Sequence, residues 1–200
     1  EDFHGSQGPI PVRRHPRETW LPLQAAFHAA CLAEGFPEDP DMNNPEASGV
    51  GPIPLNYING VRVSTALGYL DSCRHRLNLT IKGGVLVKKV LFDGKRATGI
   101  EAESGGENFT VEGDEIILSA GAVASPQLLM LSGVGPGGNL ASVGIRLVHN
   151  LEGVGQNMKN HPSLSIRFQP KEGYSLPPES PRNQVALRFS AAGSTARNDI

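Results

Sequence analysis

The sequence predicts a mixed α/β fold, and three observations carry that prediction. Short runs that favour β-strands lie between residues 85 and 112, and tight turns join them. An apolar run, Asp114–Ala120, follows them and is typical of a buried strand. After a glycine turn at Gly121, the pair Ser125-Pro126 is typical of an N-cap and the first position of a helix. A meander beside a buried strand and a helix indicates a mixed sheet.

Two helices are expected in the first half of the chain. The first runs from Thr19, its N-cap, to about Glu34. Its apolar face has helical spacing and consists of Trp20, Leu23, Phe27 and Ala30. The second runs from Ser64-Thr65, its cap, to about residue 77. Its buried face is expected to consist of Ala66, Leu70, Cys73 and Leu77.

The single tryptophan and the two cysteines are expected to be buried apolar residues. Trp20 is interpreted as a core anchor. Cys31 and Cys73 fit neither a metal spacing nor a disulfide framework. Two cysteines without a disulfide framework favour a reducing, cytoplasmic setting. We expect both thiols to fill apolar space.

The segment 36–60 is rich in Pro, Gly, Asn and Asp, and we expect it to be a functional loop or a lid. Its acidic residues Asp39, Asp41 and Glu46 lack the spacing of a calcium loop, so we expect them in solvent rather than on a metal. A tight turn is expected at Asn59-Gly60.

An antiparallel meander is the clearest prediction in the middle of the chain. Its strands are expected at 85–92, 98–103 and 108–112. Asp93-Gly94 and Gly105-Gly106 join them, and such pairs between alternating runs are strong hairpin signals. The helix that opens at Ser125 is expected to end at Gly133, in the C′ position.

Beyond residue 135 the chain is expected to be mostly loop. A short helix is expected near 140–143, and a glycine-rich turn at 153–157. Two strands are expected, at 162–168 and 184–189, with a Pro-rich loop between them.

Composition excludes several classes of function. The chain has 200 residues and a net charge of −2, without the basic footprint of a nucleic-acid-binding protein. It contains no run of 18 consecutive apolar residues, so we expect no membrane span. The pattern of a signal peptide is not visible either. It begins without Met and ends in mid-flow, so we expect it to be a piece of a longer protein.

Two motifs invite a functional interpretation. Gly133–Gly138 matches G-x-G-x-x-G, but a helix is predicted before it where a dinucleotide loop needs a strand. His161 is the most site-like of the six histidines, although a lone His is more often structural. From the residues alone, the chain is an α/β protein whose backbone turn near residue 120 favours a nucleotide-like ligand.

The stretch Gly121–Gly135 resembles the second signature of the glucose–methanol–choline (GMC) oxidoreductases and matches it at all fixed positions. Other segments also resemble family patterns, so the resemblance covers essentially the whole chain: Gly5–Val12, Gly60–Leu70, Asn78–Glu101 and Gly153–Pro162. One departure is Asn160, where the family usually has Asp.

The resemblance implies that this chain is the middle portion of such an enzyme. It implies a substrate-domain portion with the lid-like loop at 1–60, an FAD-binding-domain portion at 61–160 and the start of the substrate-binding sheet at 161–200. The family's N-terminal loop for the FAD diphosphate and its C-terminal catalytic His segment match nothing here. We therefore expect no catalytic residue in this chain, weak retention of FAD and no activity of the chain by itself.

The resemblance implies FAD as the cofactor and an alcohol as the small-molecule substrate, whose CH–OH group loses a hydride to flavin N5. In the family a hairpin valine contacts adenine through its backbone, and alignment of residues 82–90 puts that valine at Val87. Ala120 and Gly121 are expected to line the same ligand. Three alternatives stay open: Val87 as a plain core residue, a flavin-binding lyase of the hydroxynitrile-lyase kind, and a non-catalytic fragment.

Overall fold

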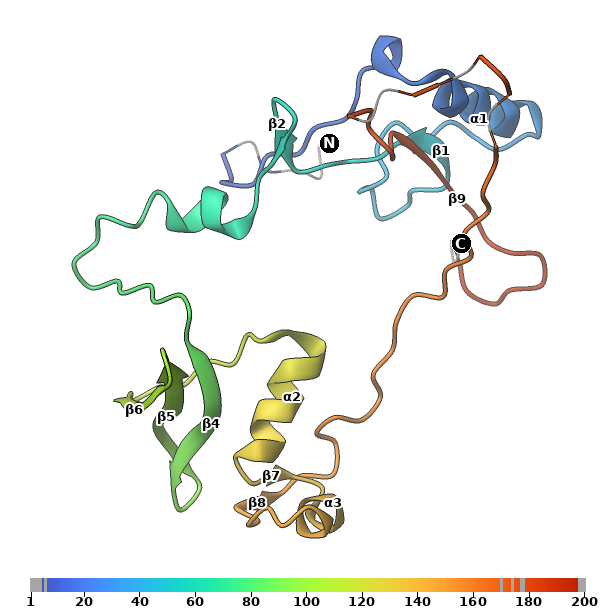
Figure 1. The fold of residues 1–200 in the computed structure, drawn as a ribbon. Coiled ribbons are helices and arrows are strands. Elements are labelled where there is room, and N and C mark those ends of the chain that lie inside the picture. Colours follow the sequence, from blue (N-terminus) through green and yellow to red (C-terminus); the bar gives the residue numbers. More distant parts are fainter. Residues whose placement is uncertain (1–4, 6, 170, 174, 177–178, 198–200) are drawn as a thin grey trace. The chain divides into compact units, whose positions relative to one another are not determined.

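The computed structural model describes residues 5, 7–169, 171–173, 175–176 and 179–197. They form two compact units, which we describe separately (Figure 1). Unit 1 comprises Glu1–Leu79 and Phe168–Ile200, and unit 2 comprises Thr80–Arg167. Helices and small sheets occur in both units, which confirms the predicted mixed α/β class. The predicted mixed sheet is wrong, because each sheet among the described strands is either purely antiparallel or purely parallel. Among the described residues, none of the helices has the length and apolarity to cross a membrane.

The described part of unit 1 contains α1 (Pro22–Ala33), two shorter helical segments and small antiparallel sheets. A short 3-10 helix, Arg17–Thr19, precedes α1. The strands are β1 (Gly49–Pro52), β2 (Tyr57–Ile58), β3 (Val61–Arg62) and β9 (Val185–Arg188). β1 pairs with β9, and β2 pairs with β3 across the predicted turn at Asn59-Gly60, where both residues have positive φ. The predicted strand at 184–189 is therefore confirmed as β9.

The core of unit 1 lies between α1 and the β1–β9 pair. Cys31, Val50 and Val185 form its buried centre. Trp20 packs against this cluster, and its indole N–H donates to the carbonyl oxygen of His15 over 2.9 Å. The predicted core roles of Trp20 and Cys31 are thus confirmed.

The first predicted helix and its end near Glu34 are confirmed, but its predicted start and buried face are wrong. α1 begins at Pro22 with Leu21 as N-cap, while Thr19 belongs to the 3-10 helix and donates its hydroxyl to the carbonyl oxygen of Pro16. The buried residues of α1 are His28 and Cys31, whereas Leu23 and Phe27 are 57% and 43% exposed. The reason is that hydrogen bonds from polar side chains also fix the position of this helix.

Two glutamines, Gln24 and Gln184, make these hydrogen bonds. Gln24 accepts the N–H of Val185 with its side-chain oxygen, over 3.3 Å. Gln184, which is fully buried, accepts the N–H of Leu21 and donates to the carbonyl oxygen of Thr19. A hydrophobic pattern cannot identify contacts of this kind, so it selected the neighbouring face.

The second predicted helix is much shorter than expected. Its helical part is a single short π-helix, Ala66–Leu70, and turns follow. Leu77 is fully exposed and Cys73 is only half-buried, so the predicted burial of both is wrong. Short helices depend on burial of an apolar face, and the end of this one has no such burial to stabilise it.

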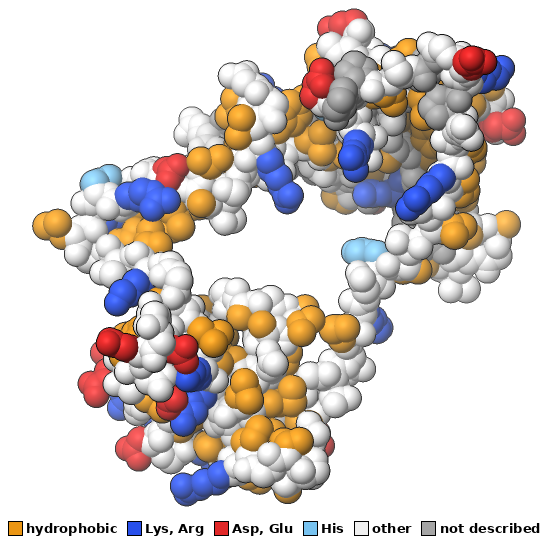
Figure 2. Space-filling view, viewed as in Figure 1, with side chains coloured by type: hydrophobic (Ala, Val, Ile, Leu, Met, Phe, Trp, Pro, Cys, Tyr) orange, Lys and Arg blue, Asp and Glu red, His pale blue; other side chains and the backbone are white. Residues whose placement is uncertain are grey.

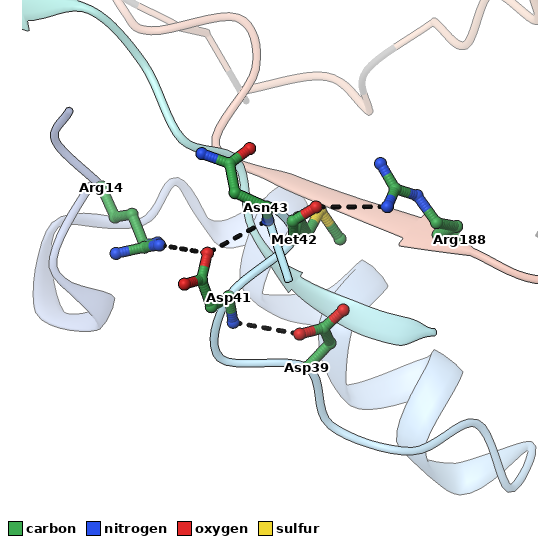
Figure 3. Close-up of polar contacts among 6 residues, drawn as sticks. All are labelled: Arg14, Asp39, Asp41, Met42, Asn43 and Arg188. Atoms are coloured by element: carbon green, nitrogen blue, oxygen red, sulfur yellow. Dashed lines mark hydrogen bonds and ion pairs between the residues drawn. The ribbon is translucent and has the colours of Figure 1, made fainter. Parts of the chain in front are cut away.

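The loop before β1 is closely packed (Figure 3). Asp39 is 6% exposed and accepts the N–H of Asp41 over 3.0 Å. Asp41 accepts the N–H of Asn43 over 3.0 Å and a hydrogen bond from the Arg14 guanidinium over 2.5 Å. The prediction that Asp39 lies in solvent is therefore wrong, because its carboxylate closes a turn inside the loop. A lid function of this loop stays a prediction.

Backbone contacts seal the same loop against β1. The N–H of Asp39 donates to the carbonyl oxygen of Val50, and the N–H of Val50 donates to that of Pro37, both over 2.9 Å. Arg188 of β9 adds a hydrogen bond to the carbonyl oxygen of Met42 over 3.2 Å (Figure 3). β1 is therefore hydrogen-bonded on one side to the loop and on the other side to β9.

His28 links the stability of unit 1 to pH. Burial lowers the pKa of His28 below its ordinary value of 6.5, and the Arg17 guanidinium lowers it further. Its Nε2 lies 3.9 Å from a Glu38 carboxylate oxygen, a pairing that would favour the charged form, yet the net direction is downward. The unfolded chain therefore binds the proton more tightly than the folded chain does.

We expect the unfolding free energy of unit 1 to be constant with respect to His28 above pH 6.5 and to fall as the pH drops below it. The slope from one such group is at most about 1.4 kcal/mol per pH unit. Urea unfolding at several pH values, followed by Trp20 fluorescence, measures it. His28→Phe should flatten the curve, whereas the same change at the exposed His75 should not; an unchanged slope in His28→Phe contradicts the assignment.

Unit 2 contains the predicted meander. β4 (Leu86–Asp93), β5 (Arg96–Ser104) and β6 (Glu107–Glu112) form one antiparallel sheet in the order β4-β5-β6, with a register shift between Val87 and Lys89. α2 (Gly121–Leu131) follows and contacts β4 (Figure 1). Then come β7 (Val134–Gly135), α3 (Gly137–Ser142) and β8 (His149–Asn150), with β7 and β8 parallel. The expected short helix and the turn at 153–157 are both present.

Two predicted strands are absent from the described residues of their segments. The run 115–119 forms no assigned strand, and Ile117 is 77% exposed. The run 162–168 likewise forms no assigned strand, with Phe168 at 78% exposure. Alternation records only which side chains could share a face, and a strand also needs a neighbouring backbone to complete its hydrogen bonds.

The start of α2 differs from the prediction. The helix begins at Gly121 with Ala120 as N-cap, so Pro126 lies inside it. Ser125 is not the cap residue, but its hydroxyl oxygen accepts the N–H of Ala120 over 2.9 Å and so satisfies a group at the helix start from within. The predicted end is correct, because the C-cap is Ser132 and Gly133 follows with φ +86°.

Candidate functional site

A groove in unit 2 brings two of the predicted site residues together. It has a volume of about 650 Å³ and runs between β4 and α2. Its strand side is Val85–Lys88, and its helix side consists of Ala120, Ala124, Gln127, Leu128 and Leu131. We call it the β4–α2 groove. Hydrophobic side chains gather over the α2 part of unit 2 (Figure 2).

The predicted site residues occupy the groove in different ways. Val87 and Ala120, 33 positions apart in sequence, both line it. Gly121 follows Ala120 at the first helical position and has φ +89°, a conformation that favours glycine. Gly121 does not itself line the groove, although its backbone forms the turn that places Ala120 there.

The strand side of the groove offers backbone groups. β4 lies at the edge of its sheet and, among the described strands, pairs with β5 alone. Every second N–H and C=O of an edge strand points away from the sheet. Such a row can pair with the hydrogen-bonding edge of a flat ring, while the apolar side chains around it contact the ring faces.

The electrostatics of the groove favour binding over catalysis. Lys88 is its single ionisable lining residue, and the Nζ atom lies 2.7 Å from a Glu103 carboxylate oxygen and 2.8 Å from the Asn108 side-chain oxygen. The remaining lining residues are apolar apart from Gln127. None of the described residues that line the groove therefore carries a carboxylate, imidazole or thiol that could act as an acid, base or nucleophile.

Other sequence candidates lie outside the groove. His161 is exposed, and its backbone N–H donates to the Asn160 side-chain oxygen over 2.9 Å. Gly133 of the G-x-G-x-x-G match follows a helix and packs closely against the carbonyl oxygen of Arg146. In the described part of the chain, no cluster of three or more His, Cys, Asp or Glu side chains is placed to hold a metal.

Sequence reasoning missed most of the helix side of the groove. Ala124, Gln127, Leu128 and Leu131 follow Ala120 at helical spacing, so a helix assumed to begin at Gly121 would have put them on one face. The later predicted start, at Ser125, concealed this pattern. Ser132 lies within the family signature at Gly121–Gly135, but its structural role was missed, because no periodicity marks a buried hydroxyl.

Comparisons with known proteins point to one family. A family model described as GMC oxidoreductase matches residues 2–163. An uncharacterised GMC-type oxidoreductase of Rhodococcus erythropolis is 40% identical over 189 residues, which cover 94% of this chain and 38% of that protein. An oxygen-dependent choline dehydrogenase of Pseudomonas putida is 42% identical over 208 residues, covering 100% and 37%.

Solved structures agree with the sequence relatives. Pyridoxine 4-oxidase from Mesorbium loti superimposes with a TM-score of 0.71 at 35% identity, covering 74% of this chain and 29% of that one. An FAD-dependent oxidoreductase from Chaetomium thermophilum gives 0.69 at 29% identity, covering 74% and 26%. The chain thus spans little more than a third of the length of the curated relatives it matches.

Proposed function

The chain belongs to the GMC oxidoreductase family, and from that premise we propose that it forms part of an FAD-dependent enzyme that oxidises the CH–OH group of a small-molecule alcohol. The names of its relatives support this, since choline and pyridoxine both carry such a group. We further propose that residues 61–160 belong to the FAD-binding part, with 1–60 and 161–200 on the substrate side. The cytoplasmic setting stays a prediction.

One observation carries the proposal: Val87 and Ala120 line one apolar groove beside an edge strand. In the proposal the backbone of Val87 pairs with the adenine edge of FAD, while Ala120 and the turn at Gly121 lie against the same part of the cofactor. An apolar groove with backbone donors and acceptors along one side suits a flat heteroaromatic ring.

Within this proposal the chain binds and orients rather than reacts. FAD, when bound, supplies the redox chemistry by accepting a hydride from the alcohol carbon. The residues of the β4–α2 groove hold the adenine end and keep water from it. None of them is an acid or base free to take the hydroxyl proton of the alcohol.

Filling the groove tests the cofactor assignment. Ala124 is half-buried on the groove face of α2, so the phenyl ring in Ala124→Phe would occupy the space proposed for adenine. We expect the affinity for FAD and for ADP to fall by at least about tenfold, the equivalent of about 1.4 kcal/mol. Isothermal titration of the product of the complete reading frame measures this. The same change at the exposed Ala141 of α3 should leave both affinities unchanged; equal affinities in the two variants contradict the assignment.

The reaction needs a separate test. Anaerobic addition of choline or pyridoxine to the FAD-loaded protein should bleach the visible absorbance of the flavin if an alcohol is the hydride donor. A lyase on the same scaffold would bind FAD without bleaching under any alcohol. The 200-residue chain alone is expected to show no alcohol-dependent bleaching.

A further inference from the structure

Ser132 makes two hydrogen bonds inside unit 2 that tie a helix to a strand. Its side chain is buried, with 7% of the residue exposed. The hydroxyl donates to the carbonyl oxygen of Leu128 over 2.6 Å and accepts the N–H of Val90 over 2.7 Å. Leu128 lies on α2 and lines the β4–α2 groove, whereas Val90 lies in the middle of β4.

This tie stands alone in the described part of unit 2. Among the described residues, no other hydrogen bond joins β4 to the segment from Ala120 to Gly133. The remaining contacts between α2 and β4 are apolar and therefore non-directional. Among the described residues, the Ser132 hydroxyl is thus the one directional contact between α2 and β4.

The position of the tie along the edge of β4 matters for the groove. The N–H of Val90, which points away from the sheet, donates to the Ser132 hydroxyl. Two to five residues earlier, at Val85–Lys88, the same edge of the strand lines the groove. A register shift in the strand lies between these two stretches, at Val87 and Lys89. The edge is therefore closed by protein at one point and left open for a ligand at the next.

We propose that Ser132 is a positioning residue for the adenine end of FAD: by holding α2 against β4 at Val90, its hydroxyl sets the width of the β4–α2 groove. This inference rests on the proposed function of the groove. It gives the Ser of the Ser132-Gly133-Val134-Gly135 segment a role through the groove walls, without any contact between Ser132 and the cofactor.

The removal of the hydroxyl should change both the edge of β4 and the affinity of the groove. In Ser132→Ala the buried N–H of Val90 loses its acceptor. We expect its hydrogen exchange to accelerate, and the affinity for FAD and ADP to fall by about three- to tenfold. Ser132→Thr keeps the hydroxyl and should restore both readouts. Calorimetry and hydrogen-exchange mass spectrometry on the product of the complete reading frame measure them.

A matched control separates positioning from general loss of stability. Val154 is 8% exposed in unit 2 and belongs to neither β4 nor α2, so Val154→Ala should weaken the unit and leave the hydrogen bond between Ser132 and Val90 in place. Its affinity for FAD and ADP should equal that of the unchanged protein at temperatures where both are folded. An affinity loss in Val154→Ala equal to that in Ser132→Ala overturns the inference.

The outcomes distinguish this inference from the proposed function. If the unchanged protein binds FAD and ADP but Ser132→Ala binds them equally well, the inference is wrong and the groove assignment stands. If Ala124→Phe has no effect on binding, the groove assignment fails and this inference fails with it. Loss of affinity in Ser132→Ala, recovery in Ser132→Thr and faster exchange at Val90 together support it.

Discussion

The substitution Gly133→Ala is expected to destabilise unit 2 by about 3 kcal/mol. Gly133 has φ +86°, where an L-residue is strained, and an added Cβ would lie 2.5 Å from the carbonyl oxygen of Arg146 and 2.9 Å from a methyl of Val148. The obstructing backbone cannot easily retreat, because the N–H groups of Val148 and His149 both donate to the carbonyl oxygen of Gly133. The glycine thus joins the end of α2 to the β7–β8 pair.

Hydrogen exchange of unit 2 under native conditions measures this loss, since the unit has no tryptophan. Gly138→Ala is the matched control. Gly138 lies in α3 without a positive φ, and a Cβ there would meet open space, so this change should be neutral or slightly stabilising. If both variants have the same stability, the packing role assigned to Gly133 is wrong.

The second large effect is expected in unit 1, at Gly51 of β1. A Cβ on Gly51 would overlap the carbonyl oxygen of Asp39, where the packed loop lies against the strand. Because the backbone N–H of Asp39 is hydrogen-bonded to the carbonyl oxygen of Val50, the loop would have to detach from β1 to make room. We expect Gly51→Ala to lower the unfolding free energy of unit 1 by about 3 kcal/mol.

Urea unfolding followed by the fluorescence of Trp20, which packs on the core of this unit, measures the change. Gly8→Ala provides the comparison, because Gly8 is exposed, has no positive φ and would bring its Cβ into open space. A midpoint for Gly51→Ala within error of the Gly8→Ala midpoint would show that the loop does not rest on β1 in solution.

The elements that the sequence predicted well are those with local causes. The meander follows from alternation and two-residue turns, which act over a few residues. The end of α2 at Gly133 follows from the need for positive φ after a helix. The hairpin at Asn59-Gly60 has the same kind of origin.

The elements that it missed depend on distant partners. The face of α1 is selected by Gln24 and Gln184, and the second of these is more than 150 residues away from the helix. The run 115–119 has the apolar pattern of a strand but no paired backbone among the described residues. The start of α2 was predicted too late in the sequence, because the pair Ser125-Pro126 looks like a helix start although Pro126 lies inside the helix.

The candidate site shows the same division. A family pattern at Val87 and a small-residue turn at Ala120 could each be read from local sequence, and the fold places both in one groove. The signature at Gly121–Gly135 includes Ser132, but local sequence does not show its role, because that role comes from the N–H of Val90, 42 positions earlier. A buried hydroxyl has no periodic signature, and only the three-dimensional structure shows what it satisfies.

The discontinuity of unit 1 has a consequence for how the chain is made. β1 at residues 49–52 is completed by β9 at 185–188, and all of unit 2 lies between them in sequence. During translation, residues 80–167 emerge as one continuous stretch with mostly local pairings, so unit 2 is free to fold first. The edge of β1 that faces β9 therefore stays unpaired until residues 185–188 have left the ribosome, whereas the loop at 37–39 can already pair with the other edge. An unpaired strand edge is open to pairing with another chain, so the interval between the synthesis of β1 and that of β9 is one in which unit 1 is exposed to aggregation.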